Sequence, residues 1–142
     1  MHMISTSDCG NRFDIHPKNK QPIGIRMALS ARQHVYGEAV QGDAPIAVEM
    51  KVQDKQICIR FDNAVSLHLE GQEFQELEIY TGEEKCEITG WSVNEDTLTV
   101  FIKEAIISNE ITAVFAQTPY YQVSLFNENG LPAFPFILQK RR

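Results

Sequence analysis

The second part of the chain is dominated by a period-two alternation of apolar and polar residues. It is clearest where Ile46, Val48, Met50 and Val52 alternate with other residue types before a polar turn. Such alternation is typical of a strand that buries one face. Similar segments recur at 57–61, 65–69, 74–80, 86–93, 97–102, 111–116 and 121–126. About eight short strands separated by polar turns predict an antiparallel β-sandwich.

The chain before Gly42 has a different pattern, which predicts one helix over residues 19–36. Asn19 is a candidate N-cap, Pro22 is tolerated in a first turn, and Gly37 is placed to end the helix. We therefore expect a loop and a helix at residues 1–41, followed by an all-β domain at residues 42–142.

The predicted helix carries an apolar stripe, because apolar residues recur at every fourth position. The stripe consists of Ile23, Met27, Ala31 and Val35. Small residues beside it favour close packing against another layer. Because an exposed apolar stripe is an association site, we expect the helix to pack on the sandwich, to be buried in a homo-oligomer, or to be loosely held.

Composition and charge narrow the classes of partner. With 142 residues, 43% of them hydrophobic and 23% charged, the chain fits a soluble globular protein. A formal net charge of −6 argues against nucleic acid as a partner, and the basic residues 140–142 are interpreted as a solvated end. No run reaches the roughly 18 apolar residues of a membrane span, and residues 1–13 do not resemble a secretory signal.

The cysteines and histidines give no expectation of a metal or another cofactor. Cys9, Cys58 and Cys86 lack C-x-x-C spacing, so a zinc site is not indicated, although three thiols still allow one disulfide. His34 near the helix end and His68 on a predicted solvent face receive structural interpretations. No two histidines have ligand spacing together with a carboxylate.

Catalytic chemistry is indicated first by His16, which precedes the predicted helix. Its imidazole could take a proton from a serine hydroxyl and return it to a leaving alcohol. Asp14 is near enough in sequence to orient the ring through Nδ1. A bare Asp-x-His triplet also fits an ordinary surface loop.

A longer set of blocks resembles, in order and spacing, the region near the end of sialate O-acetylesterases, which are SGNH-type hydrolases. The blocks are Asp8-Cys9-Gly10-Asn11, residues 14–21, Arg26-Met27-Ala28-Leu29, Val35-Tyr36-Gly37 and residues 125–136. The resemblance covers nearly the whole chain, and its most specific part is His16-Pro17-Lys18-Asn19-Lys20.

The resemblance implies hydrolysis of O-acetyl esters on sugars, typically at the 9 position of sialic acid, by a serine nucleophile without a metal. Acetylated hemicellulose is the main rival substrate, and such enzymes are commonly exported or lysosomal. His16 aligns with the catalytic histidine. Asp14 stands two residues before it, where SGNH hydrolases commonly have Asp-x-x-His. Asp8 matches the family's acidic residue before a glycine more closely, but is interpreted first as a turn or capping residue, so the acid that supports His16 stays open.

The family's nucleophile block is not found among the serines of this sequence. None has a Gly-x-Ser or Gly-Asp-Ser setting: they are Ser5, Ser7, Ser30, Ser66, Ser92, Ser108 and Ser124. Nucleophile, base and oxyanion hole act as a unit. We therefore expect a C-terminal fragment of an esterase that is inactive alone, with the rest of the esterase domain and an O-acetylated sugar as partners.

The alternative is a non-catalytic β-sandwich module that binds glycan or packs against a partner. Trp91, Tyr120 and Tyr121 could then form a platform on which a sugar stacks. Aromatic side chains at strand ends equally serve packing, so the sequence leaves both interpretations open.

Overall fold

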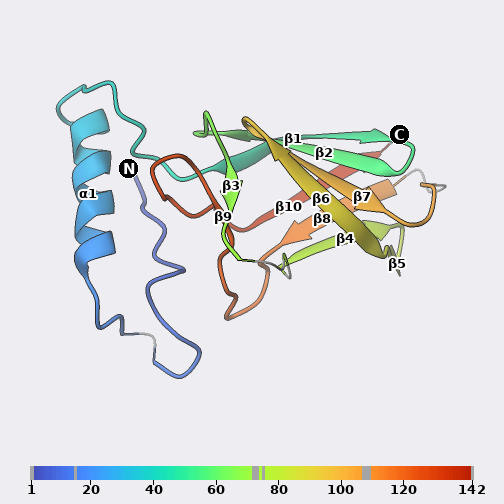
Figure 1. Cartoon of the computed structure of the whole chain (residues 1–142), viewed down its shortest axis with the longest axis horizontal. Helices are drawn as coiled ribbons and strands as arrows, with labels where there is room; N and C mark the ends of the chain where they lie inside the picture. The colour runs from blue at the N-terminus through green and yellow to red at the C-terminus, as the bar shows by residue number, and fades with distance from the viewer. Residues whose placement is uncertain (1, 15, 72–73, 75, 107–109, 142) are drawn as a thin grey trace.

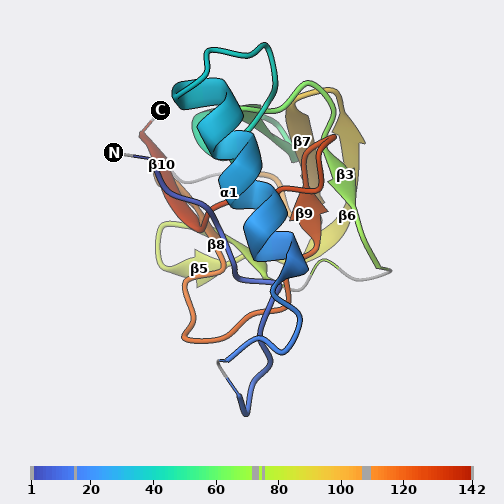
Figure 2. The same ribbon diagram turned by 90° about the vertical axis from the view of Figure 1, so that its left-hand side faces the viewer.

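The computed structural model describes residues 2–14, 16–71, 74, 76–106 and 110–141. It places one helix, α1 (Gln21–His34), at one end of the molecule and the β-sheets at the other (Figure 1). The N-terminal segment runs beside α1, between the helix and the sheets (Figures 1 and 2). Ser108 and Arg142, which the sequence interpretation included, lie outside the described residues.

The first sheet has the strand order β1-β2-β7-β6 and is antiparallel throughout. Its strands are β1 (Ile46–Gln53), β2 (Gln56–Asp62), β7 (Thr97–Ile102) and β6 (Ile88–Asn94). β1 and β2 form a hairpin, and Asp54 in its turn adopts a φ of 53°. Aspartate tolerates this left-handed conformation, which a tight turn requires. A register shift between Ala47 and Glu49 leaves Ile46 and Val48 exposed, so the predicted apolar face of β1 is buried only from Met50 onward.

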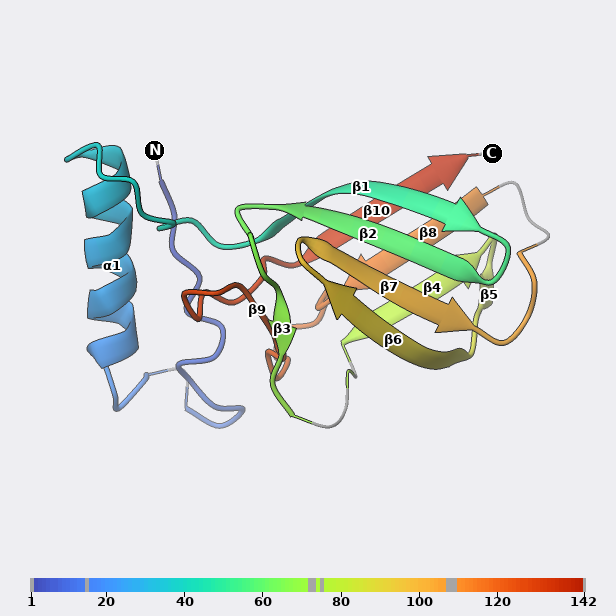
Figure 3. The same cartoon turned by 45° about the horizontal axis from the view of Figure 1, so that its top comes forward.

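The second sheet has the order β10-β8-β4-β5 and is also antiparallel. It consists of β10 (Phe136–Arg141), β8 (Glu110–Phe115), β4 (Leu77–Thr81) and β5 (Glu84–Lys85). A short pair, β3 (His68–Leu69) with β9 (Leu125–Phe126), lies nearer to α1 (Figure 3). The prediction of a mainly antiparallel β fold preceded by one helix is confirmed.

One hydrophobic core is built from alternate residues of the central strands of both sheets. From the first sheet, β2 and β7 bury Ile57, Ile59, Phe61, Leu98, Val100 and Ile102; from the second, β4 and β8 bury Leu77, Ile79, Ile111, Ala113 and Phe115. Period-two burial along four strands is the direct cause of the alternation seen in the sequence. Figure 3 shows the two sheets as separate layers.

The strands differ in two places from the sequence expectation. Lys140 and Arg141 belong to edge strand β10 and pair with Ile111 and Glu110 of β8, and the Arg141 side chain is 86% exposed to solvent, as expected for a solvated end. The strand predicted at residues 121–126 is reduced to Leu125–Phe126. The preceding residues instead form a loop that lines a pocket.

The helix is shorter than predicted, and its N-cap is Lys20 rather than Asn19. Asn19 still serves this end, since its Oδ1 accepts a hydrogen bond from the backbone N–H of Gln21 at 3.0 Å. Pro22 lies in the first turn, and Gly37 after the helix has a φ of 69°. No helix in the described part of the chain is long and apolar enough to cross a membrane.

The helix buries a charged residue while much of its apolar stripe is exposed. Arg26 is the one helical residue in the buried class, whereas Met27 and Val35 are 60% and 74% exposed. Ile25, next to Arg26, is also more than half exposed. Within this chain, Arg26 holds α1 by polar contacts, and the part of the apolar stripe formed by Met27 and Val35 is left uncovered.

Candidate functional site

The loop that carries the predicted catalytic residues is closed by Asn11. The side-chain oxygen of Asn11 accepts hydrogen bonds from the backbone N–H groups of Phe13 and Asp14, both at 2.9 Å. The Asn11 N–H in turn donates to the Asp14 carbonyl at 3.1 Å. Asparagine is suited to this role because its amide can replace backbone hydrogen bonds in a turn. The loop therefore presents Asp14 in a defined position.

Asp14 and His16 are brought together. Asp14 Oδ1 accepts a hydrogen bond from the His16 backbone N–H at 2.9 Å and lies 3.3 Å from His16 Nδ1. The His16 side chain is 85% exposed and that of Asp14 is 43% exposed. A carboxylate beside Nδ1 favours the tautomer whose Nε2 carries a free lone pair. The arrangement can accept a proton at Nε2 from a group that approaches from outside.

Among the described residues, no serine hydroxyl is hydrogen-bonded to the His16 imidazole. Ser5 is buried with its Oγ 2.9 Å from that of Ser7, and Ser124 is buried with its Oγ donating to Glu76. Those hydroxyls are engaged in structural contacts.

Asp8, the other candidate acid, pairs with Arg26 instead of His16. Its two carboxylate oxygens lie 2.6 Å from Arg26 Nη1 and Nη2 in a bidentate ion pair. Burial acts to raise the pKa of Asp8, but the hydrogen bonds and charge of Arg26 outweigh it and lower that pKa below the ordinary value. Hydrogen bonding to Asp8 raises the pKa of Arg26. The interpretation of Asp8 as a residue that supports the loop agrees with this contact.

Arg26 joins three distant segments. Besides Asp8, it donates to the Ser5 carbonyl at 3.0 Å and to the Gly130 carbonyl at 3.3 Å. The sequence analysis named Arg26 but gave it no role. The signal for a role was its position in a block that resembles the esterases, and its guanidinium anchors the helix to the N-terminal segment and to the loop after β9.

A second anchor, Asn127, lies in the loop that precedes Gly130 and is fully buried. Its amide nitrogen donates to the carbonyls of Asp43 and Asn63, at 3.3 and 2.9 Å. Its oxygen accepts from the N–H groups of Asn129 and Leu131. All of its amide groups are thus engaged, which fixes the loop before β1 against the loop after β9.

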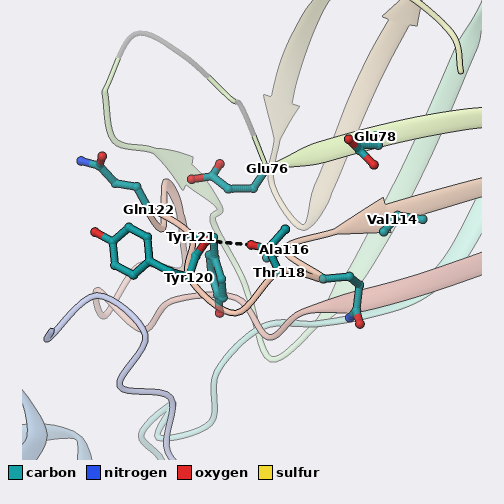
Figure 4. Close-up of a pocket in the computed structure, with 9 residues that line it drawn as sticks. Glu76, Glu78, Val114, Ala116, Thr118, Tyr120, Tyr121 and Gln122 are labelled. Carbon is teal, nitrogen blue, oxygen red and sulfur yellow. Dashed lines mark hydrogen bonds between the residues drawn. The ribbon is translucent and has the colours of Figure 1, made fainter. Parts of the chain in front are cut away.

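The loop after β8 lines a pocket of about 350 Å³ that Figure 4 shows in close-up. Tyr120 and Tyr121 form part of its wall together with Glu76, Glu78 and Gln122. Hydrogen bonding to Lys85 and to Tyr80 lowers the pKa of Glu78. Trp91 does not line this pocket and packs edge-on against Phe74, with ring centroids 6.0 Å apart. The predicted sugar platform of Trp91, Tyr120 and Tyr121 is therefore not formed in this pocket, which Trp91 does not line.

A separate group of potential metal ligands consists of His2, His34 and Asp43. Their nearest ligand atoms lie within 4.8 Å of one another. No pattern in the sequence indicates this group, because the three residues come from segments that meet only in the folded chain.

Comparison with known proteins agrees with the resemblance in the sequence. The chain is 25% identical to mouse sialate O-acetylesterase over 135 residues, which cover 88% of this chain and 25% of that enzyme. A crystal structure of a carbohydrate acetylesterase from Xanthomonas citri matches with a TM-score of 0.76 at 25% identity, over 92% of this chain and 31% of that one. The chain is therefore similar to carbohydrate acetylesterases in both sequence and fold.

No protein-family model matches the sequence. The predicted resemblance to sialate O-acetylesterases is confirmed, and the chain spans about a quarter of the length of the mouse enzyme that it matches.

Proposed function

We propose that this chain supplies the general base, His16, to a carbohydrate O-acetylesterase whose serine nucleophile and oxyanion hole come from polypeptide outside these residues. The observation that carries the proposal is the Asp14 carboxylate set against Nδ1 of an exposed imidazole, in a chain related to acetylesterases. O-acetylated sialic acid is the proposed substrate, in keeping with the name of the mouse relative.

The proposed chemistry uses His16 Nε2 twice in acyl transfer. It takes the proton of the serine hydroxyl as that oxygen attacks the acetyl carbonyl, and it returns the proton to the sugar oxygen as the ester bond breaks. Water then repeats the cycle and releases acetate. Asp14 holds the ring and stabilises its charged form, which is the part that a carboxylate plays in a triad.

The exposed residues of α1 favour the presence of a second protein layer beside the loop that carries His16. Ile25 and Met27 are more than half exposed, and the small residues Gly24 and Ala28 are exposed next to them. Small side chains allow a second layer to approach the helix closely. We propose that residues 1–41 complete a hydrolase domain there and that residues 42–142 form a sandwich domain attached to it.

A chimera tests the proposal. The Xanthomonas citri acetylesterase without the region that matches this chain should show no turnover of an aryl acetate, and neither should this chain alone. Joining this chain in place of that region should restore turnover and labelling by a fluorophosphonate. The variant D14N should reduce the restored rate. H68A should leave the rate unchanged, because His68, which lies 3.7 Å from Glu70, belongs to β3 and not to the loop that carries His16. Turnover by the isolated chain that depends on His16 would overturn the proposal.

The pocket beside Tyr120 favours a second candidate, glycan binding without catalysis. Tyr120 is 45% exposed, and its backbone carbonyl accepts a hydrogen bond from Thr118 at 2.7 Å (Figure 4). An exposed ring among carboxylate and amide groups suits a sugar, which offers an apolar face and hydroxyls. Binding of an acetylated glycan by the isolated chain, lost in Y120A and kept in H16A, would favour this function over the first.

A further inference from the structure

Two imidazoles and a carboxylate converge at the C-terminal end of α1. His34 is the last residue of the helix, Asp43 lies in the loop before β1, and His2 belongs to the N-terminal segment. His34 Nε2 lies 2.8 and 2.9 Å from the two oxygens of Asp43, and the ring of His2 stacks on that of His34 with centroids 3.5 Å apart. The nearest ligand atoms of the three groups fall within 4.8 Å.

His34 and Asp43 are held in place by the backbone between them. Gly42 passes so close to the helix that a Cβ there would lie 2.5 Å from the Leu29 carbonyl oxygen. The Gly42 N–H donates to the side chain of Gln33 at 2.6 Å. The Asp43 carbonyl accepts from the buried amide of Asn127. Outer contacts of this kind are what orient the ligands of a metal site.

His2 is the adjustable member of the group. Its residue is exposed, whereas the side chains of His34 and Asp43 are 19% and 24% exposed. Its segment is nevertheless tied to the helix a few residues later, where Arg26 binds the Ser5 carbonyl and Asp8. The N-terminal segment therefore keeps His2 near the helix end while leaving its ring free to turn.

We propose that His2, His34 and Asp43 bind a divalent transition-metal ion of the zinc class, which would tie the N-terminal segment to the end of α1. Two imidazole nitrogens and one carboxylate suit such an ion, and water would complete a tetrahedron. This site is separate from His16 and does not depend on the proposed esterase function.

The geometry needs a small adjustment. Ligand atoms bound to one Zn²⁺ at about 2.0–2.2 Å lie roughly 3.4 Å from one another. His34 Nε2 and Asp43 Oδ1, which lie 2.8 Å apart, must separate by about 0.6 Å to admit the ion. His2 must turn from its stacked position to point a nitrogen at the ion. His34 must present Nε2 without a proton, so binding releases any proton that Nε2 donates to Asp43.

Isothermal titration of the full chain with ZnCl₂ tests the proposal, with Co²⁺ as a spectroscopic probe whose visible absorption reports tetrahedral nitrogen and oxygen ligands. We expect one equivalent to bind and the affinity to fall at least tenfold in H2A and in H34A. H2A is the decisive variant because an exposed residue can be truncated without unfolding the chain. Zn²⁺ should also raise the melting temperature of the unmodified chain and have less effect on that of H2A.

Two other histidine–carboxylate pairs provide matched controls. His68 lies 3.7 Å from Glu70, and His16 lies 3.3 Å from Asp14, but each pair offers only two ligands. H68A and H16A should bind Zn²⁺ as tightly as the unmodified chain. Binding of less than one equivalent, equal affinity in H2A, or an equal loss in either control would overturn the proposal.

Discussion

Replacing Arg26 by methionine should release the helix and the N-terminal segment from the rest of the molecule. Methionine keeps much of the length and apolar stem of arginine but removes the guanidinium. The substitution leaves the Asp8 carboxylate without its bidentate partner and the Ser5 carbonyl without its donor. It also breaks the contact with Gly130, which links α1 to the loop after β9.

The expected cost is about 2–3 kcal/mol. Breaking a fully buried ion pair by removing one partner costs about 3–5 kcal/mol. The Asp8 side chain is 25% exposed, so water can solvate part of its charge once Arg26 is gone, and the expected cost falls below that range. Because about 1.4 kcal/mol corresponds to a factor of ten, local opening of the helix should become about 30- to 150-fold more frequent.

Hydrogen exchange resolved to peptides measures this effect directly. In R26M, amides of Gln21–His34 should lose protection by that factor, while amides of β2 and β7 should keep theirs. The matched control is R32M on the same helix, where the exposed pair with Glu38 should contribute less than about 1 kcal/mol. Helix protection that changes less than threefold in R26M, or equally in both variants, would refute the reasoning.

Three further predictions follow from the same anchors. Because the pKa of Asp8 is lowered in the folded chain, its carboxylate stabilises the fold at every pH above the ordinary aspartate pKa, and this stabilisation is lost as the pH falls through the lowered pKa. Acid should therefore increase hydrogen exchange of residues 21–34 more in the unmodified chain than in D8N. G42A should destabilise the chain by about 1–3 kcal/mol in urea, because its methyl would meet the Leu29 backbone; an unchanged midpoint would show that this approach is not tight. N127A should cost about 3 kcal/mol or more, since it strands buried backbone groups; a smaller loss would mean that water replaces the amide.

The strands of the core could be predicted from sequence because their burial is local and periodic. In β2 and β7 alternate residues face one core, and these residues are apolar, so the alternation can be read directly from the sequence. Edge strand β10 could not be predicted in this way, because its Lys140 and Arg141 look like a solvated tail. Its register is set by pairing with β8, more than twenty residues earlier, which no local pattern reports.

In the candidate site, too, the contacts between residues near in sequence could be predicted and those between distant segments could not. Asp14 and His16 are two residues apart, and a single turn closed by Asn11 is enough to bring them together. Arg26 escaped prediction because its partners are scattered along the chain, the farthest being Gly130. The group of His2, His34 and Asp43 escaped for the same reason. Contacts that depend on the meeting of distant segments leave no periodic trace in the sequence.

The catalytic role of His16 is tested most directly by the rate at which the chimera with the Xanthomonas citri acetylesterase removes acetyl groups from an O-acetylated sugar, measured with His16 and with alanine in its place. Loss of a positioned general base typically costs about 10²- to 10⁴-fold in rate. The account predicts that H16A lowers the kcat of the chimera at least about 10²-fold, with an unchanged circular dichroism spectrum. An H16A chimera that retains its rate would contradict it.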